Sequence, residues 1–229
     1  MTKTHSSSNL SNICLSAMFC SSDCQQNAAQ FHRYECPVMP SILKSGSVNI
    51  ALRIFFIALT AFEGNIKELQ NFVNEIDQSA STIYDFDFSK RNSSENIKKY
   101  LTCLNSLSRS SKSFSLQQHV EILKNHPELQ KVWNSHEKFI RNFLQRQCQT
   151  NDLYFHGIFG GSLRKDEQKE PAAVIKSLQM PIGSGWFPFC SLINHSCAPN
   201  VLRIYVDAKV VLVACQPIEK GGQLFDCYK

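Results

Sequence analysis

The sequence predicts an α+β fold in which a helical middle part precedes a small β-rich C-terminal part. Apolar residues recur at three- and four-residue steps through much of the range 48–144, which is typical of amphipathic helices. Apolar and polar residues then alternate within 201–215, which is typical of half-buried strands. Because a cysteine-rich stretch comes before both, we expect three parts, residues 1–37, 38–150 and 151–229.

The composition is that of an ordinary globular protein. The 229 residues carry a net charge of +5, and 43% are hydrophobic and 19% charged, which argues against wholesale disorder and against a membrane protein. The most apolar run, Ile54 to Phe62, is too short for a bilayer span of about 20 residues. We therefore expect no membrane partner. No run of Lys or Arg exceeds two residues, so a nucleic-acid patch is unsupported, and a zinc-dependent nucleic-acid binder stays open only as a weaker third alternative.

The first part carries residues of the kind that bind zinc, namely Cys14, Cys20, Cys24, His32 and Cys36. Zinc prefers sulfur and imidazole ligands, and short spacings let two ligands from one turn reach the same ion. The chain opens without a basic-then-apolar signal segment, so we expect a reducing compartment, where clustered cysteines are metal ligands rather than disulfides. Two alternatives stay open: a single zinc site, or a truncated finger that holds no metal firmly.

The middle part is predicted to be helical, with polar connections. We expect helices at about 48–62, 66–76, 95–107, 116–123 and 127–151. Gly64 should end the first of them, Asn125-His126 the fourth, and Pro127 should begin the last. His136 lies on the apolar stripe of that last helix, and we interpret it as a hydrogen-bonded core or boundary histidine rather than a ligand.

The C-terminal part places a dense polar cluster, Asn194, His195, Ser196 and Cys197, just before Pro199. Such a turn exposes donors and acceptors at one point, and by itself it predicts a small-molecule or metal corner. The alternation that follows predicts a β-hairpin with one buried face, formed by Leu202, Ile204 and Val206 and by Val210, Leu212 and Ala214. A turn at Gly221-Gly222 then leads to an extended piece that carries Tyr228.

Two stretches resemble the motifs of SET-domain protein methyltransferases. Asn194-His195-Ser196-Cys197-Ala198-Pro199-Asn200 is similar to the family's NHSCxPN motif, and the tail from Ile218 to Tyr228 is similar to its second, Gly-Glu-Glu-Leu motif. The run from Phe19 to Pro37 resembles the second half of a MYND zinc finger. Together they identify the SET and MYND domain-containing group, most like the group around its fourth member.

The resemblance implies a fold and a reaction. It implies a small β-rich SET core (C-terminal part, 151–229), a helical insert (38–150) and a partial MYND finger (1–37). It implies that S-adenosylmethionine is the cofactor and a protein lysine side chain the substrate. A proline-rich peptide at the finger and a cytoplasmic and nuclear location are further expectations.

The resemblance also assigns roles to single residues. By motif position Tyr228 would be the catalytic tyrosine, and Asn194 and His195 would hold the cofactor. Asn151 stands where the family has an Asn that touches the cofactor, and Cys197 would share a zinc with cysteines of a later segment. The residues alone leave plainer roles open: a helix cap for Asn151, a turn at 194–195, packing for Tyr228 and a buried thiol for Cys197.

Two functions therefore remain as hypotheses. One is a protein-lysine methyltransferase, and the other is a non-catalytic interaction module in which a finger remnant sits on a SET-like scaffold. Three departures from the family favour a truncated and inactive chain: no Gly-x-Gly turn lies before Cys14, Gly222 stands where a Glu is usual, and the chain stops at Lys229.

Overall fold

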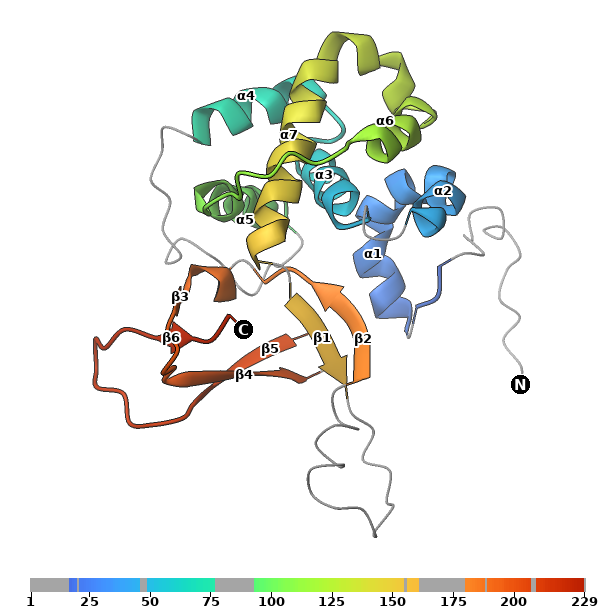
Figure 1. The fold of residues 1–229 in the computed structure, drawn as a ribbon. Coiled ribbons are helices and arrows are strands. Elements are labelled where there is room, and N and C mark those ends of the chain that lie inside the picture. Colours follow the sequence, from blue (N-terminus) through green and yellow to red (C-terminus); the bar gives the residue numbers. More distant parts are fainter. Residues whose placement is uncertain are drawn as a thin grey trace, which may run out of the picture. The chain divides into compact units, whose positions relative to one another are not determined.

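The fold was analysed in a computed structural model, which describes residues 17–19, 21–45, 49–76, 93–154, 156–160, 180–187, 189–206 and 209–228 (Figure 1). The chain forms two compact units. The N-terminal unit takes the described parts of Met1–Phe72, Lys90–Ile97 and Ser115–Gln145, and the C-terminal unit takes those of Val73–Ser89, Lys98–Phe114 and Arg146–Lys229. The described residues contain helices and a few short strands, as the predicted fold class requires. None of the described helices is both long and apolar enough to cross a bilayer.

The helices from α3 to α6 follow the predicted periodicity closely, whereas α1 and α2 were not predicted. They are α1 (Ser22–Glu35), α2 (Met39–Lys44), α3 (Asn49–Ala61), α4 (Ile66–Ile76), α5 (Ser94–Ser106), α6 (Gln117–Lys124) and α7 (Trp133–Tyr154), with single 3-10 turns at Cys36–Val38, Leu129–Lys131 and Cys190–Leu192. The prediction that the last helix runs from Pro127 to Asn151 was wrong at both ends. A 3-10 turn follows Pro127, and α7 continues to Tyr154, so Asn151 lies inside the helix and does not cap it.

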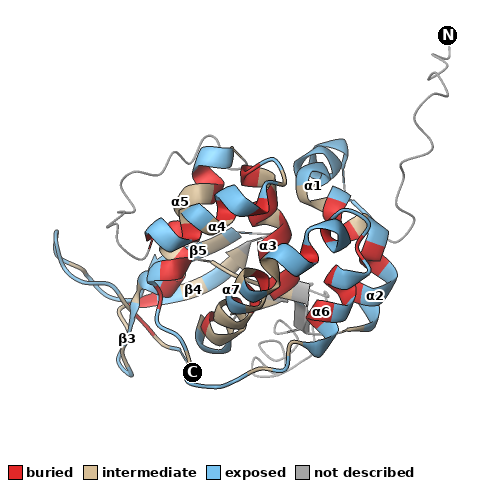
Figure 2. Ribbon diagram, turned by 90° about the horizontal axis from the view of Figure 1, so that it is seen from above, coloured by how far each residue is buried: buried red, intermediate tan, exposed pale blue. Residues whose placement is uncertain are grey.

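The core of the N-terminal unit is built around α3. Leu52, Phe55, Phe56 and Leu59 are fully buried, and the ring centroids of Phe55 and Phe143 lie 5.6 Å apart. Figure 2 shows this burial along α3. As predicted, α3 ends just before Gly64, whose φ of 85° belongs to the left-handed region. A Cβ at this glycine would also lie 2.8 Å from the Tyr34 hydroxyl, so the turn requires glycine for two reasons.

His126 ties the connection after α6 to the core of the same unit. Its imidazole is fully buried, with Nε2 2.9 Å from the Tyr34 carbonyl oxygen, to which it donates. Nδ1 accepts from the backbone N–H groups of Glu128 and Leu129 at 3.2 and 3.3 Å. These three bonds require the neutral ring with its proton on Nε2. His136 is also hydrogen-bonded, with its Nδ1 3.3 Å from Gln70 Oε1, which agrees with the structural role expected for it.

The described strands of the C-terminal unit form three two-stranded sheets. β1 (His156–Gly160) and β2 (Met180–Gly185) are antiparallel, as are β4 (Val201–Val206) and β5 (Lys209–Ala214), whereas β3 (Asn194–His195) and β6 (Phe225–Asp226) are parallel. The predicted hairpin at 201–215 is therefore present as β4 and β5. The division of the chain into a finger, a helical insert and a C-terminal SET part stays a prediction.

The predicted buried face of the hairpin was wrong for its first strand. Leu202 and Ile204 are 57% and 40% exposed, whereas Val201 is buried and Arg203 and Tyr205 are half-buried on the opposite face. In the antiparallel register Arg203 faces Leu212, which is half-buried as predicted. The strand turns this way because the guanidinium of Arg203 has a buried carboxylate partner in β6.

Acidification should destabilise the folded chain. Burial lowers the pKa of His126 below 6.5 and that of His119 to about 4, so both rings are neutral when folded and take up protons on unfolding. Their contribution to stability is complete above pH 6.5 and is lost as the pH falls toward 4. Urea unfolding at pH 7, 5.5 and 4.5 should show a falling midpoint, with a shallower fall in His119→Leu. If the midpoint fell equally with pH in the wild type and in His119→Leu, His119 would not be a source of the acid sensitivity.

Candidate functional site

The parallel pairing of β3 with β6 joins the two motifs that the sequence singled out. Asn194 pairs with Phe225 and His195 with Asp226, and the backbone N–H of Ser196 donates to the Asp226 carbonyl oxygen at 2.9 Å. We call residues 194–197 the polar bend. The polar bend and the C-terminal strand are separated by about thirty residues of sequence, yet they lie side by side (Figure 1).

His195 and Tyr228 face one another at this junction. Their ring centroids are 5.2 Å apart, and the backbone N–H of Tyr228 donates to His195 Nδ1 at 3.1 Å. The Tyr228 hydroxyl donates to the carbonyl oxygen of Ile193, immediately before the polar bend. Because Nδ1 accepts this bond, the ring proton lies on Nε2, which is 3.4 Å from Cys197 Sγ.

Asn200 clamps the loop between the two motifs. Its side-chain Oδ1 accepts from the backbone N–H of Phe225 at 2.7 Å, and its Nδ2 donates to the Gln223 carbonyl oxygen at 2.8 Å. Its backbone N–H also donates to the Phe225 carbonyl oxygen at 3.1 Å. β6 is only two residues long, so these bonds supply much of what fixes its position. Asn200 stands within the quoted motif, but its structural role was not predicted.

A second anchor of β6 is the ion pair of Arg203 and Asp226. Arg203 Nε lies 2.7 Å from Asp226 Oδ2, and the two side chains are 17% and 5% exposed. The guanidinium also donates to the Cys227 carbonyl oxygen at 2.8 Å and to Nδ1 of His156 on β1. One side chain of β4 therefore contacts β1 and both residues that precede Tyr228. This contact was not predicted, because the expected buried face of the strand was the one with Leu202 and Ile204, which leaves Arg203 on the other face.

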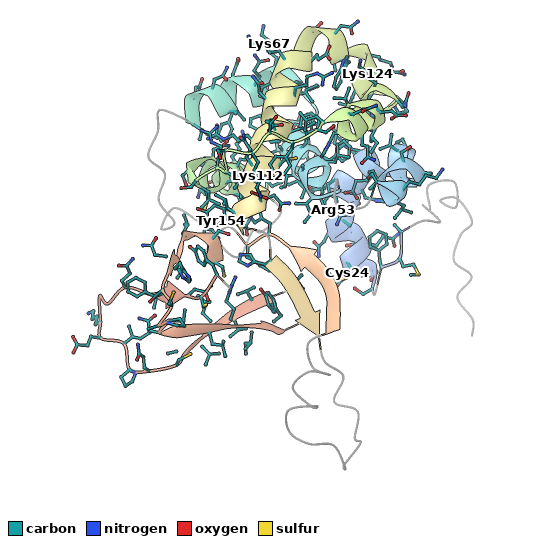
Figure 3. All side chains as sticks on the ribbon, viewed as in Figure 1. Cys24, Arg53, Lys67, Lys112, Lys124 and Tyr154 are labelled. Carbon is teal, nitrogen blue, oxygen red and sulfur yellow. The ribbon has the colours of Figure 1, made fainter. Side chains whose placement is uncertain are left out.

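The electrostatics keep both nearby titratable rings neutral around pH 7. Burial, together with the nearby Arg203 charge, lowers the pKa of His156 to about 4 even though the Asp226 carboxylate acts in the opposite direction. Burial raises the pKa of Tyr228 above 10, and the phenol of Tyr154 adds to that rise. Tyr154 ends α7 and is labelled in Figure 3. The Tyr228 hydroxyl therefore stays protonated and remains a donor to Ile193.

Comparison with known proteins identifies the family. The model of the SET domain family matches residues 2–229.

The chain belongs to the SET domain family.

The curated relatives of this SET chain carry consistent names. It is 24% identical to protein-lysine N-methyltransferase SMYD4 of Homo sapiens over an alignment of 272 positions. That alignment covers 94% of this chain and 33% of the human protein. It is 28% identical over 92 residues to the Gallus gallus protein of the same name, covering 40% of this chain and 11% of that one. A histone-lysine N-methyltransferase SMYD3 of Mus musculus is 40% identical over 47 residues, 20% of this chain and 11% of that protein.

These matches confirm the resemblance to the SET and MYND domain-containing group that the motifs indicated. The chain spans about a third of the length of the human relative it matches. No solved structure matches.

Three of the residues predicted for the methyl-transfer site lie together in the C-terminal unit: Asn194, His195 and Tyr228. Cys197, which was predicted as a zinc ligand, lies beside His195. Asn194 and His195 are exposed, and 46% of Tyr228 is accessible, so their side chains are open to a ligand. Asn151 lies in the part of α7 that belongs to the same unit, and its Oδ1 is buried with no hydrogen-bond partner among the described residues. An acceptor without a partner is compatible with a ligand contact.

The predicted zinc ligands are only partly described. Cys14 and Cys20 lie outside the described residues, whereas Cys24 and His32 lie on α1 and Cys36 follows it. His32 Nε2 is buried and has no described hydrogen-bond partner, but no group of three or more His, Cys, Asp or Glu within the described ranges is placed to hold a metal. The described residues thus do not form a zinc site, and the finger, its zinc and its proline-rich ligand stay predictions.

Asn200 offers a test of the loop clamp. Asn200→Asp keeps the acceptor for the Phe225 N–H but replaces the donor to Gln223 with an oxygen that repels its carbonyl, whereas Asn200→Ala removes both bonds. We expect destabilisation of the C-terminal unit by about 1–3 kcal/mol in Asn200→Ala and less in Asn200→Asp. Hydrogen exchange of the Phe225 amide should become faster in Asn200→Ala. An unchanged rate would show that β6 does not depend on this clamp.

Proposed function

We propose that this chain carries the methyl-transfer site of a SET-type protein-lysine N-methyltransferase that uses S-adenosylmethionine. The observation that carries the proposal is the contact of His195 with Tyr228, which unites the two family motifs at one exposed place. Membership of the SET domain family supports the reaction class, as do relatives named protein-lysine N-methyltransferases. The substrate class is accordingly a lysine side chain of another protein.

Asn194 and His195 are proposed to bind the cofactor. Both project from β3 into solvent, and an amide beside an imidazole offers donors and acceptors for the polar groups of a nucleoside. The Tyr228 N–H donates to Nδ1, so the donor of the ring is Nε2, which lies 3.4 Å from Cys197 Sγ and would turn from this weak acceptor to the cofactor. S-adenosylmethionine, when bound, would supply a sulfonium methyl group that a lysine nitrogen attacks with its lone pair while the carbon–sulfur bond breaks.

Tyr228 is proposed to favour the transition state. During the transfer the positive charge passes from sulfur to nitrogen, and the methyl group between them is electron-poor. Because the Tyr228 hydroxyl donates to Ile193, its oxygen lone pairs remain available to face that methyl group. Fixed oxygen dipoles stabilise such a charge without reorganising, and holding the amine in line with the methyl supplies most of the rate. Because the pKa of Tyr228 is raised, its hydroxyl stays protonated at neutral pH.

Titration with S-adenosylhomocysteine tests the binding half of the proposal. Isothermal calorimetry should give a specific, saturable heat, and His195→Ala should weaken the affinity at least tenfold, about 1.4 kcal/mol, because the donor at Nε2 is lost. His136→Ala is the matched control, since His136 is hydrogen-bonded to Gln70 in the N-terminal unit. Absence of heat at high ligand concentration would favour a non-catalytic interaction module instead.

Replacement of the phenol tests the chemical half. Tyr228→Phe keeps the ring against His195 and the backbone N–H bond but removes the hydroxyl. We expect S-adenosylhomocysteine affinity to stay within about threefold, while single-turnover transfer of radiolabelled methyl to a lysine peptide slows at least tenfold. Tyr100→Phe, on a ring that packs 5.7 Å from that of Phe189, is the control for loss of a hydroxyl elsewhere in the unit. Equal rates in Tyr228→Phe and wild type would contradict the role.

A further inference from the structure

Arg203 has contacts that exceed what a surface strand requires. Its guanidinium reaches the Asp226 carboxylate at 2.7 Å, the Cys227 carbonyl oxygen at 2.8 Å and Nδ1 of His156. Asp226 and Cys227 are the two residues directly before Tyr228. Two of the three contacts thus hold the segment that precedes Tyr228, one through the Asp226 side chain and one through the Cys227 carbonyl oxygen.

We propose that Arg203 is a positioning residue for methyl transfer, which holds the backbone of residues 226 and 227 so that the Tyr228 hydroxyl and amide meet Ile193 and His195. The proposal rests on the proposed function for its catalytic meaning, but its geometric content can be tested separately. Arg203 touches neither of the two groups, the His195 imidazole and the Tyr228 hydroxyl, that would meet the cofactor and the methyl. It acts through the two residues that it binds.

The three contacts need the shape of arginine. A guanidinium presents several N–H donors in a rigid plane, so it can bind a carboxylate, a carbonyl and an imidazole at once. A lysine ammonium carries the same charge but is a compact group on a flexible stem, and it cannot span the three acceptors together. His156 suits the third contact because its pKa of about 4 leaves Nδ1 free to accept.

The same pair need not contribute much to folding. Removing two charges from water costs several kcal/mol, and replacing a buried ion pair by apolar residues of similar size is often neutral or stabilising. A geometric role is therefore separable from a stabilising one. The double variant Arg203→Met with Asp226→Leu removes the pair without leaving a lone buried charge, so it should keep the fold and lose the positioning.

Tyr228 itself reports on the pair. The groups that face its phenol are Tyr154 from α7, Asp226 from β6, Arg203 from β4 and the His195 ring from β3. Burial raises the pKa of Tyr228, and so do Tyr154 and Asp226, whereas Arg203 lowers it. Loss of the cation should therefore move the pKa of Tyr228 up, and loss of the anion alone, in Asp226→Asn, should move it down. Opposite shifts in the two variants would show that both charges lie close to the Tyr228 phenol in the folded chain, and the rate of methyl transfer then separates positioning from folding.

The test uses the full chain with its tyrosines replaced by 3-fluorotyrosine. The fluorine signal that disappears in Tyr228→Phe is assigned to Tyr228. The variants are Arg203→Met, Arg203→Lys, Asp226→Asn and the apolar double variant. Arg53→Met is the matched control, because Arg53 binds the buried Glu35 carboxylate at 2.7 Å in the N-terminal unit (labelled in Figure 3). Readouts are the thermal midpoint, the fluorine shift and its pH titration, S-adenosylhomocysteine affinity, and single-turnover methyl transfer at saturating cofactor.

We expect the double variant to keep its thermal midpoint within a few degrees, to shift the Tyr228 fluorine signal, and to slow methyl transfer roughly 10- to 100-fold. Arg203→Lys should recover only part of the rate. Arg53→Met should leave the Tyr228 signal and the rate per folded molecule unchanged. An unmoved fluorine signal in the double variant and in Arg203→Met, or a rate that only follows the folded fraction, would overturn the proposal.

The two proposals fail in different ways. If the wild-type chain neither binds S-adenosylhomocysteine nor transfers methyl, the proposed function is wrong, and the fluorine shifts still decide whether Arg203 positions Tyr228. If the wild type is active and the double variant is equally active, the positioning role is wrong and the function stands.

Discussion

The geometry of the site depends on the buried contact between Arg203 and Asp226. The ladder between β3 and β6 is only two residues long at each strand, which is too short to fix a register by backbone bonds alone. Side chains from outside the ladder fix the register instead. Arg203 binds Asp226 of β6, and Asn200 binds the Phe225 N–H at the start of β6. The position of Tyr228 relative to the polar bend follows from these anchors.

The two units are stabilised in different ways. The N-terminal unit buries aromatic and aliphatic side chains around α3, a source of stability that is roughly proportional to the apolar area removed from water. The described strands of the C-terminal unit depend more on directed polar contacts, and their hairpin leaves Leu202, Ile204, Val211 and Val213 exposed. Polar contacts fix angles and distances, which a site that aligns reacting atoms requires. The cost of such a design is that removal of a single partner leaves a buried charge behind.

Local sequence signals predicted the helices α3 to α6 and the β4–β5 hairpin, but not α1, α2, β1 or β2. Apolar spacing gave α3 to α6 to within about two residues at each end, and the Asn-His-Ser-Cys and Leu-Phe-Asp-Cys-Tyr stretches pointed to the residues that meet at the site. Periodicity could not predict the facing of β4, because both alternating sets of residues in Val201–Val206 contain apolar side chains. The outcome depended on Arg203 finding a partner 23 positions away, and sequence spacing carries no such information. The extension of α7 past Asn151 was not predicted, because the polar run Gln149-Thr150-Asn151 was interpreted as the end of the helix.

A direct test of the account is the protonation pattern of the His195 imidazole, measured by two-bond ¹H–¹⁵N correlation spectroscopy at neutral pH. The hydrogen bond from the Tyr228 amide predicts the tautomer with its proton on Nε2, with Nδ1 showing the shift of an acceptor and a coupling to the Tyr228 amide proton. A ring protonated at Nδ1, with a Tyr228 amide that exchanges freely with water, would contradict the claim that the two motifs form one site.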